Sequence, residues 1–125
     1  MQNPRSNASH KDYTEFKAQH NNTDRLGTFD FTEETIIREF THWVIIKNRF
    51  PYDNVAKVND MLVSRKPIGR HYDGTEEEER EYHDILKLLA QEDYYDALIE
   101  NFPSTKSVKK FAHTHLIIWS NSKKK

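Results

Sequence analysis

The chain has 125 residues, no cysteine and a formal net charge of −1 at pH 7. This length suits one small domain, the lack of cysteine excludes disulfides and thiolate metal sites, and the near-neutral charge gives no strong nucleic-acid signal. No apolar run approaches the ~20 residues that span a bilayer, and the polar beginning is no secretory signal, so we expect a cytoplasmic protein that does not enter a membrane.

Polarity along the chain predicts three parts. Residues 1–30 form a polar N-terminal arm, within which Asp12 to His20 has the spacing of a short helix. Residues 31–121 carry the apolar patterns of a folded domain, and residues 122–125 form a basic tail. A small domain buries a limited share of its surface, so formation of a dimer would add to the buried surface.

Strand patterns open the folded part. Residues 34–47 are rich in β-branched and aromatic side chains and predict two successive strands, joined near residues 40–42. Proline fixes a turn at residues 50–54, and Met61 to Ser64 predicts the next strand. Residues 65–71 then form a basic loop.

One long helix has the clearest local signal in the chain. Thr75 and Glu78 have the spacing of a capping box, and four consecutive glutamates would lie beside the positive end of the helix dipole. Apolar residues then recur at helical spacing, at Tyr82, Ile85, Leu86 and Leu89. Residues 93–102 predict a further strand, and residues 103–106 a turn.

The last predicted strand, residues 111–119, places two histidines two residues apart. Alternate strand side chains share a face, so His113 and His115 would lie about 7 Å apart on one side. The members of that face would be Phe111, His113, His115, Ile117 and Trp119. Paired imidazoles suit nucleophilic attack on phosphorus or metal ligation. The whole pattern predicts an α+β fold of about five strands and one helix.

Several motifs in this order resemble the histidine triad (HIT) superfamily. They are the strand and Asn-x-Phe-Pro-Tyr-Asp turn at residues 43–53, the Met-Leu-Val strand and basic turn at 61–67, and the His-x-His strand. Asn101 precedes His113 by twelve residues, and Ser107 lies between them, as in the family's phosphate-site segment. The resemblance covers roughly residues 34–119. It implies a HIT-like antiparallel meander sheet with the helix packed across it, and a homodimer.

The family signature is His-x-His-x-His followed by two apolar residues, and this chain departs from it. In the register we favour, Phe111 replaces the first histidine, His113 is the central, nucleophilic one and His115 is the third. Leu116-Ile117 then supplies the apolar pair. In the other register His115 is nucleophilic and Ile117 stands at the third position, similar to the galactose-1-phosphate uridylyltransferase branch, which has glutamine there.

The resemblance implies a nucleotide-binding hydrolase or nucleotidyl transferase that acts on the α-phosphate of a nucleoside phosphate. His113 would form a covalent nucleotidyl-histidine, and His115 would donate to a phosphate oxygen or the leaving group. Nucleotide-binding residues would be Asn101, Ser107, Asn48, Phe50 and Asp53, with Ile45 and Tyr52 beside Phe50 in an apolar slot for the base. This scheme requires neither a metal nor a cofactor.

Two other functions remain open at this point. Phe111, and Asn59 at a place where many relatives carry histidine, suggest a nucleotide- or partner-binding HIT-like module with weakened or lost turnover. A metal-binding protein would use His113 and His115 with His71 or His42. The remaining histidines, His83 among them, carry no usable signal.

Overall fold

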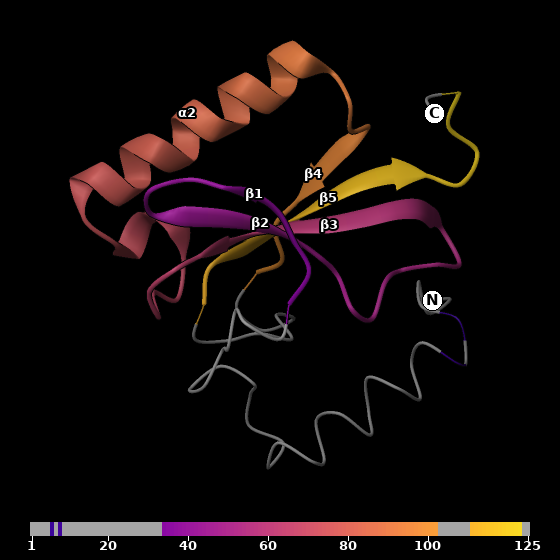
Figure 1. Ribbon diagram of the computed structural model, residues 1–125, viewed down its shortest axis with the longest axis horizontal. Helices are drawn as coiled ribbons and strands as arrows, with labels where there is room; N and C mark the ends of the chain where they lie inside the picture. Colours follow the sequence, from indigo (N-terminus) through magenta and orange to yellow (C-terminus); the bar gives the residue numbers. More distant parts are fainter. Residues whose placement is uncertain (1–5, 7, 9–33, 103–110, 124–125) are drawn as a thin grey trace.

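The computed structural model describes residues 34–102 and 111–123, together with Ser6 and Ala8. The expected helix in the N-terminal arm and the candidate residue Ser107 lie outside these residues. The described elements are β1 (Ile36–Glu39), β2 (Trp43–Lys47), β3 (Ala56–Ser64), the 3-10 helix η2 (His71–Asp73), α2 (Glu76–Glu92), β4 (Ala97–Ile99) and β5 (His113–Trp119). The expected α+β architecture of one sheet and one long helix is confirmed for this part of the chain (Figure 1).

All strands of the sheet pair antiparallel, in the order β1-β2-β3-β5-β4. The first three strands follow one another as the expected meander, but the last two are exchanged. The reason is the helix, because α2 carries the chain over one face of the sheet to its far side (Figure 1). The chain then returns as β5 between β3 and β4. This interior place suits β5, whose residues Leu116, Ile117 and Ile118 are fully buried.

Two strand boundaries differ from the sequence patterns. β3 begins at Ala56, five residues before the predicted start at Met61, and pairs with both β2 and β5. Polar residues at positions 57, 59 and 60 break the apolar pattern there, and pairing with the buried strand β5 overrides that weak local preference. β4 covers only Ala97–Ile99 of the strand predicted at residues 93–102, and it pairs with β5 alone, at the edge of the sheet.

The predicted capping box begins α2. The Thr75 hydroxyl accepts a hydrogen bond from the backbone N–H of Glu78 (3.1 Å), and the Glu78 carboxylate accepts one from the N–H of Thr75 (2.9 Å). These bonds satisfy two N–H groups that a helix start leaves without partners. They also lower the pKa of Glu78, because the Thr75 backbone stabilises the charged carboxylate.

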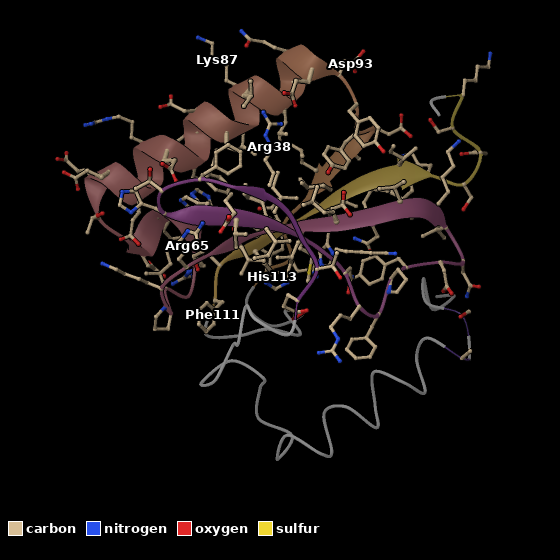
Figure 2. All side chains as sticks on the ribbon, viewed as in Figure 1. Arg38, Arg65, Lys87, Asp93, Phe111 and His113 are labelled. Carbon is tan, nitrogen blue, oxygen red and sulfur yellow. The ribbon has the colours of Figure 1, made fainter. Side chains whose placement is uncertain are left out.

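Each face of the sheet has its own apolar cluster. The α2-facing cluster contains Trp43, Ile45, Leu62, Tyr82, Ile85, Leu89, Ala112 and Leu116. The opposite cluster contains Val44, Ile46, Met61, Val63 and Phe111. Figure 2 shows Phe111 and His113 on the side of the sheet away from α2. No helix in the described part of the chain combines the length and apolar character needed to cross a membrane.

Candidate functional site

His113 and His115 lie side by side on β5, on the face of the sheet that α2 leaves uncovered. His113 pairs with Val63 of β3, and His115 pairs with Met61. The ring centroids are 5.2 Å apart, and the ring planes are inclined by 76°. His113 is 2% exposed and His115 is 1% exposed. The predicted shared face is therefore confirmed, with both rings buried.

A hydrogen-bond network fixes the tautomer of His115. The Asn59 side-chain oxygen accepts from the backbone N–H of Tyr52 (3.0 Å), so the Asn59 amide nitrogen must face the other way. That nitrogen donates to the Asp60 carbonyl (3.2 Å) and lies 3.4 Å from Nδ1 of His115. Nδ1 of His115 therefore accepts, and in the neutral ring the proton lies on Nε2.

The proton on His115 points at a tyrosine. Nε2 of His115 is 3.2 Å from the hydroxyl of Tyr52, and the two rings stack with centroids 4.8 Å apart. Because Nε2 carries the proton, the Tyr52 hydroxyl is the acceptor. Tyr52 therefore covers His115 and engages the N–H that the predicted contact with a leaving group would need.

His113 has the opposite tautomer. Its Nδ1 is 3.3 Å from the backbone carbonyl of Phe111, and a carbonyl can only accept. The proton of the neutral ring is therefore on Nδ1, and the lone pair is on Nε2, whose surface is buried. An imidazole held in this way by a carbonyl presents Nε2 as its nucleophilic atom.

The turn after β2 is tied to the same network. The side-chain oxygen of Asn48 accepts from the N–H of Phe50 (3.0 Å), and its nitrogen donates to Asn59 (3.0 Å). Asn48 and Phe50 are both buried. Two predicted nucleotide-binding residues therefore meet the histidine site, but as structural members of the turn. The Asn48 side chain and the N–H of Phe50 are hydrogen-bonded within the protein, without a nucleotide.

A cleft of about 740 Å³ lies beside this network. Asn48, Asp53 and Asn59 line it, but His113 and His115 are not among its lining residues. The Asp53 carboxylate accepts a hydrogen bond from the Ser6 hydroxyl (2.7 Å), so this predicted nucleotide-binding residue has a partner in the described part of the chain.

The cleft also contains a buried carboxylate on the α2 side of the sheet. Asp60 accepts a hydrogen bond from the hydroxyl of Tyr95 at 2.6 Å. Burial raises the pKa of Asp60, although the Tyr95 hydrogen bond and the charge of Lys47 lower it in part. The same burial and the adjacent carboxylate raise the pKa of Tyr95, which stays protonated.

Other predicted site residues lie elsewhere. Asn101 is half-buried, two residues after β4, and its side chain makes no hydrogen bond to the described part of the chain. Ile45 belongs to the α2-facing cluster, so the predicted base slot of Ile45, Phe50 and Tyr52 is wrong. Neighbouring residues of a strand point to opposite faces of the sheet, so Val44 faces the histidine side and Ile45 faces α2.

The alternative metal site, made of His113 and His115 with His71 or His42, is not brought together in the described residues. His71 stacks on Tyr82 of α2, on the other side of the sheet from the histidine pair. Among the described residues, His113 and His115 belong to no group of three metal-ligand side chains. The sheet itself separates the proposed ligands.

Asn59 and Tyr52 are the functional residues whose roles sequence reasoning missed. The predicted strand began at Met61, which left Asn59 outside it. A signal was present, since Asn59 is two residues before Met61 and so shares its face of the sheet, which is also the face of His115. No protein-family model matches this chain, and no curated protein matches it.

Proposed function

We propose that the protein binds a nucleoside phosphate over β5 and processes its α-phosphate through a covalent nucleotidyl-histidine on His113, as the HIT resemblance implies. The observation that carries this proposal is the pair of complementary tautomers. His113 presents a lone pair at Nε2, and His115 presents a proton at its own Nε2. A nucleophile and a hydrogen-bond donor thus stand two residues apart on the same face of one strand.

The reaction has two balanced steps. Nε2 of His113 attacks the α-phosphorus, the P–N bond forms as the bond to the leaving group breaks, and the leaving group departs as an anion that accepts a hydrogen bond from the N–H of His115. Water or another hydroxyl acceptor then attacks the phosphorus and releases its proton to solvent, and the P–N bond breaks to free the Nε2 lone pair of His113. Donation by His115 requires its N–H to leave the Tyr52 hydroxyl, so Tyr52 holds the site in a resting arrangement.

Burial of both rings sets a further condition. With exposed fractions of 2% and 1%, the two histidines meet a nucleotide only when the surface over β5 opens. Opening adds a conformational step before chemistry, which we expect to make turnover slow.

A second function, nucleotide binding without turnover, is favoured by two observations. Phe111 stands in the place of the first histidine and packs in the apolar cluster with Met61 and Val63, so that corner offers no polar contact. The cleft that contains Asn48 and Asp53 is separate from the histidine rings, and its volume falls within the range of small-molecule sites.

Mass spectrometry of intact protein tests both functions. We would mix the chain with adenosine and guanosine phosphoramidates and dinucleoside polyphosphates, with His113→Ala and His42→Ala in parallel. His42 is a matched control because it lies between β1 and β2, outside the site. A nucleotidyl adduct or product lost in His113→Ala alone supports the enzyme. Bound nucleotide without product supports the binding module. Neither binding nor turnover would reject both.

Circular dichroism spectra show whether the buried substitution leaves the fold intact. Phe111→His supplies a second test that does not remove any site residue. If Phe111 is what limits turnover, this variant forms more adduct or product than the natural chain does. An adduct level that is unchanged in both Phe111→His and His113→Ala would contradict the assignment of His113 as nucleophile.

A further inference from the structure

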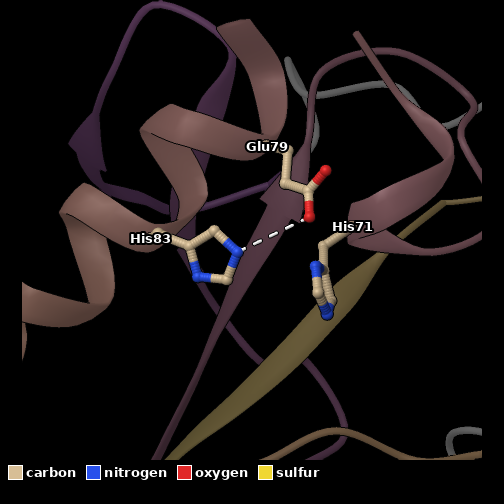
Figure 3. Close-up of side chains that lie close together, drawn as sticks. All are labelled: His71, Glu79 and His83. Carbon is tan, nitrogen blue, oxygen red and sulfur yellow. Dashed lines mark ion pairs between the residues drawn. The ribbon is translucent and has the colours of Figure 1, made fainter. Parts of the chain in front are cut away.

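A second group of chemically active side chains lies on the α2 side of the sheet. His71 belongs to η2, and Glu79 and His83 belong to α2. One potential ligand atom from each lies within 4.8 Å of the others. Figure 3 shows the three side chains directed toward one another, with the Glu79 carboxylate between the two rings.

Helix geometry explains two members of the group. Glu79 and His83 are four residues apart, so they lie one above the other on one face of α2. Oε1 of Glu79 is 3.6 Å from Nε2 of His83. Their side chains are 41% and 59% exposed, so both can rotate toward a shared ligand from the solvent side. Alone, this pair would be an ordinary surface contact on a helix.

His71 makes the group more than such a pair. Its ring stacks on Tyr82, with centroids 4.3 Å apart and planes inclined by 3°. Nε2 of His71 lies 3.5 Å from the carboxylate of Glu100. The ring therefore packs on an aromatic face, and its Nε2 faces a carboxylate.

The other nitrogen of His71 is the informative atom. Nδ1 is buried and has no hydrogen-bond partner among the described residues. The tautomer with its proton on Nε2, the nitrogen that faces Glu100, has its lone pair on Nδ1. A buried acceptor without a partner is unfavourable, and a bound cation would remove that cost. Metal-binding histidines commonly have this arrangement, in which a carboxylate takes the second N–H and orients the ring.

We propose that His71, Glu79 and His83 bind one Zn²⁺ ion, with Glu100 as the residue that orients His71. Two imidazoles and one carboxylate are a typical three-ligand zinc set, and a water would complete the tetrahedron. Ligand atoms around tetrahedral zinc lie about 3.3 Å apart. The present spacing of up to 4.8 Å closes to that value by rotation of the two exposed side chains.

The metal would join three elements. Glu79 and His83 would attach the metal to α2, and His71 would attach it to η2. The ring of Tyr82, on which His71 stacks, reaches the sheet because its hydroxyl is 2.8 Å from the hydroxyl of Thr114 in β5. Thr114 lies between the two histidines of the candidate catalytic site, on the opposite face of the strand. Zinc binding therefore stabilises the packing of α2 on β5 without touching the site itself.

The test uses the full, untagged chain after treatment with a chelator. Calorimetric titration with ZnCl₂ measures affinity and stoichiometry, and the visible absorption of bound Co²⁺ reports on coordination. The variants are Glu79→Gln and His83→Gln, which change exposed residues and should leave the fold intact. Glu77→Gln is the matched control, because it removes the same charge from the same helix turn at an exposed position.

We expect one zinc per chain and a rise in the melting temperature on binding. Glu100→Gln should weaken binding about 10–100-fold, and loss of a direct ligand should weaken it more. Glu77→Gln should bind zinc as the natural chain does. Absence of binding, or affinity unchanged in both Glu79→Gln and His83→Gln, would overturn the site. Binding abolished only by His113→Ala would also overturn it, because the zinc would then lie on the other face.

Discussion

At the scale of single residues, Asn59 organises the candidate catalytic site. One buried amide receives hydrogen bonds from Asn48 and Tyr52 and donates toward His115. It thereby joins the turn after β2 to the histidine strand and fixes the tautomer of His115. The chemistry of the site thus depends on a residue that touches neither the nucleophile nor, in our proposal, the phosphate.

Replacement of Asn59 tests this network. Asn59→Leu keeps a similar volume but leaves the N–H donors of Asn48 and Tyr52 without their acceptor. A buried donor without a partner costs about 1–3 kcal/mol, so we expect the free energy of unfolding to fall by at least about 2 kcal/mol. Urea unfolding followed by circular dichroism measures the change. Asn121→Leu, at an exposed turn after β5, is the control. A loss below about 0.5 kcal/mol would mean that the network is not formed.

At the scale of elements, α2 is attached to the sheet at each end. At its start, the indole N–H of Trp43 donates to the backbone carbonyl of Glu78 (2.8 Å). Beyond its end, the hydroxyl of Tyr95 donates to Asp60 of β3. The second attachment includes a buried carboxylate, so its contribution to stability depends on pH.

The Asp60 carboxyl sets the direction of that dependence. Its pKa in the folded protein is raised above the ordinary value of 3.8, chiefly by burial. Between 3.8 and the raised pKa the folded chain keeps a proton that the unfolded chain has released, so stability falls as pH rises through this interval. Asp60→Asn removes the titration and can still accept from Tyr95. We expect the variant to gain stability relative to the natural chain as pH rises.

Urea midpoints measured from acid to neutral pH, for both proteins, isolate the effect of Asp60 from the other carboxyl groups. The difference between the two curves should increase with pH and then become constant above the raised pKa. Parallel curves, or a difference that decreases with rising pH, would contradict the raised pKa.

At the scale of the whole molecule, the sheet separates two kinds of chemistry. One face has the histidine pair of β5, and the other has α2 and the proposed zinc ligands. The edge beyond β5 is short, since β4 has three residues and pairs on one side only. Leu98 of β4 is 42% exposed, and a groove of about 360 Å³ lies between this edge and the end of α2.

The homodimer stays a prediction, and this edge is where we expect it to form. An exposed edge strand with an apolar side chain favours pairing with a second chain. Sedimentation equilibrium should give a dimer for the natural chain, and Leu98→Lys should shift it toward monomer. Lys57→Gln, an exposed change on β3, serves as the control. A natural chain that stays monomeric at high concentration would contradict the prediction.

Local signals were sufficient for much of the fold. The capping box of Thr75 and Glu78 is formed by residues three positions apart, so the sequence predicts it directly. Strand periodicity likewise predicts the common face of His113 and His115, and the two strands at residues 34–47. These features depend on neighbours in the chain, whose relative positions are set by backbone geometry alone.

Only the tertiary structure decided which distant residues meet. The place of β5 between β3 and β4 brings Asn59 to His115, and the strand faces put Ile45 on the other side from both histidines. The packing of η2 back onto α2 brings His71 to Glu79 and His83. Such contacts follow from the order in which strands pair and from the face that a helix covers. Those choices minimise exposed apolar surface over the whole chain, so no single segment can specify them.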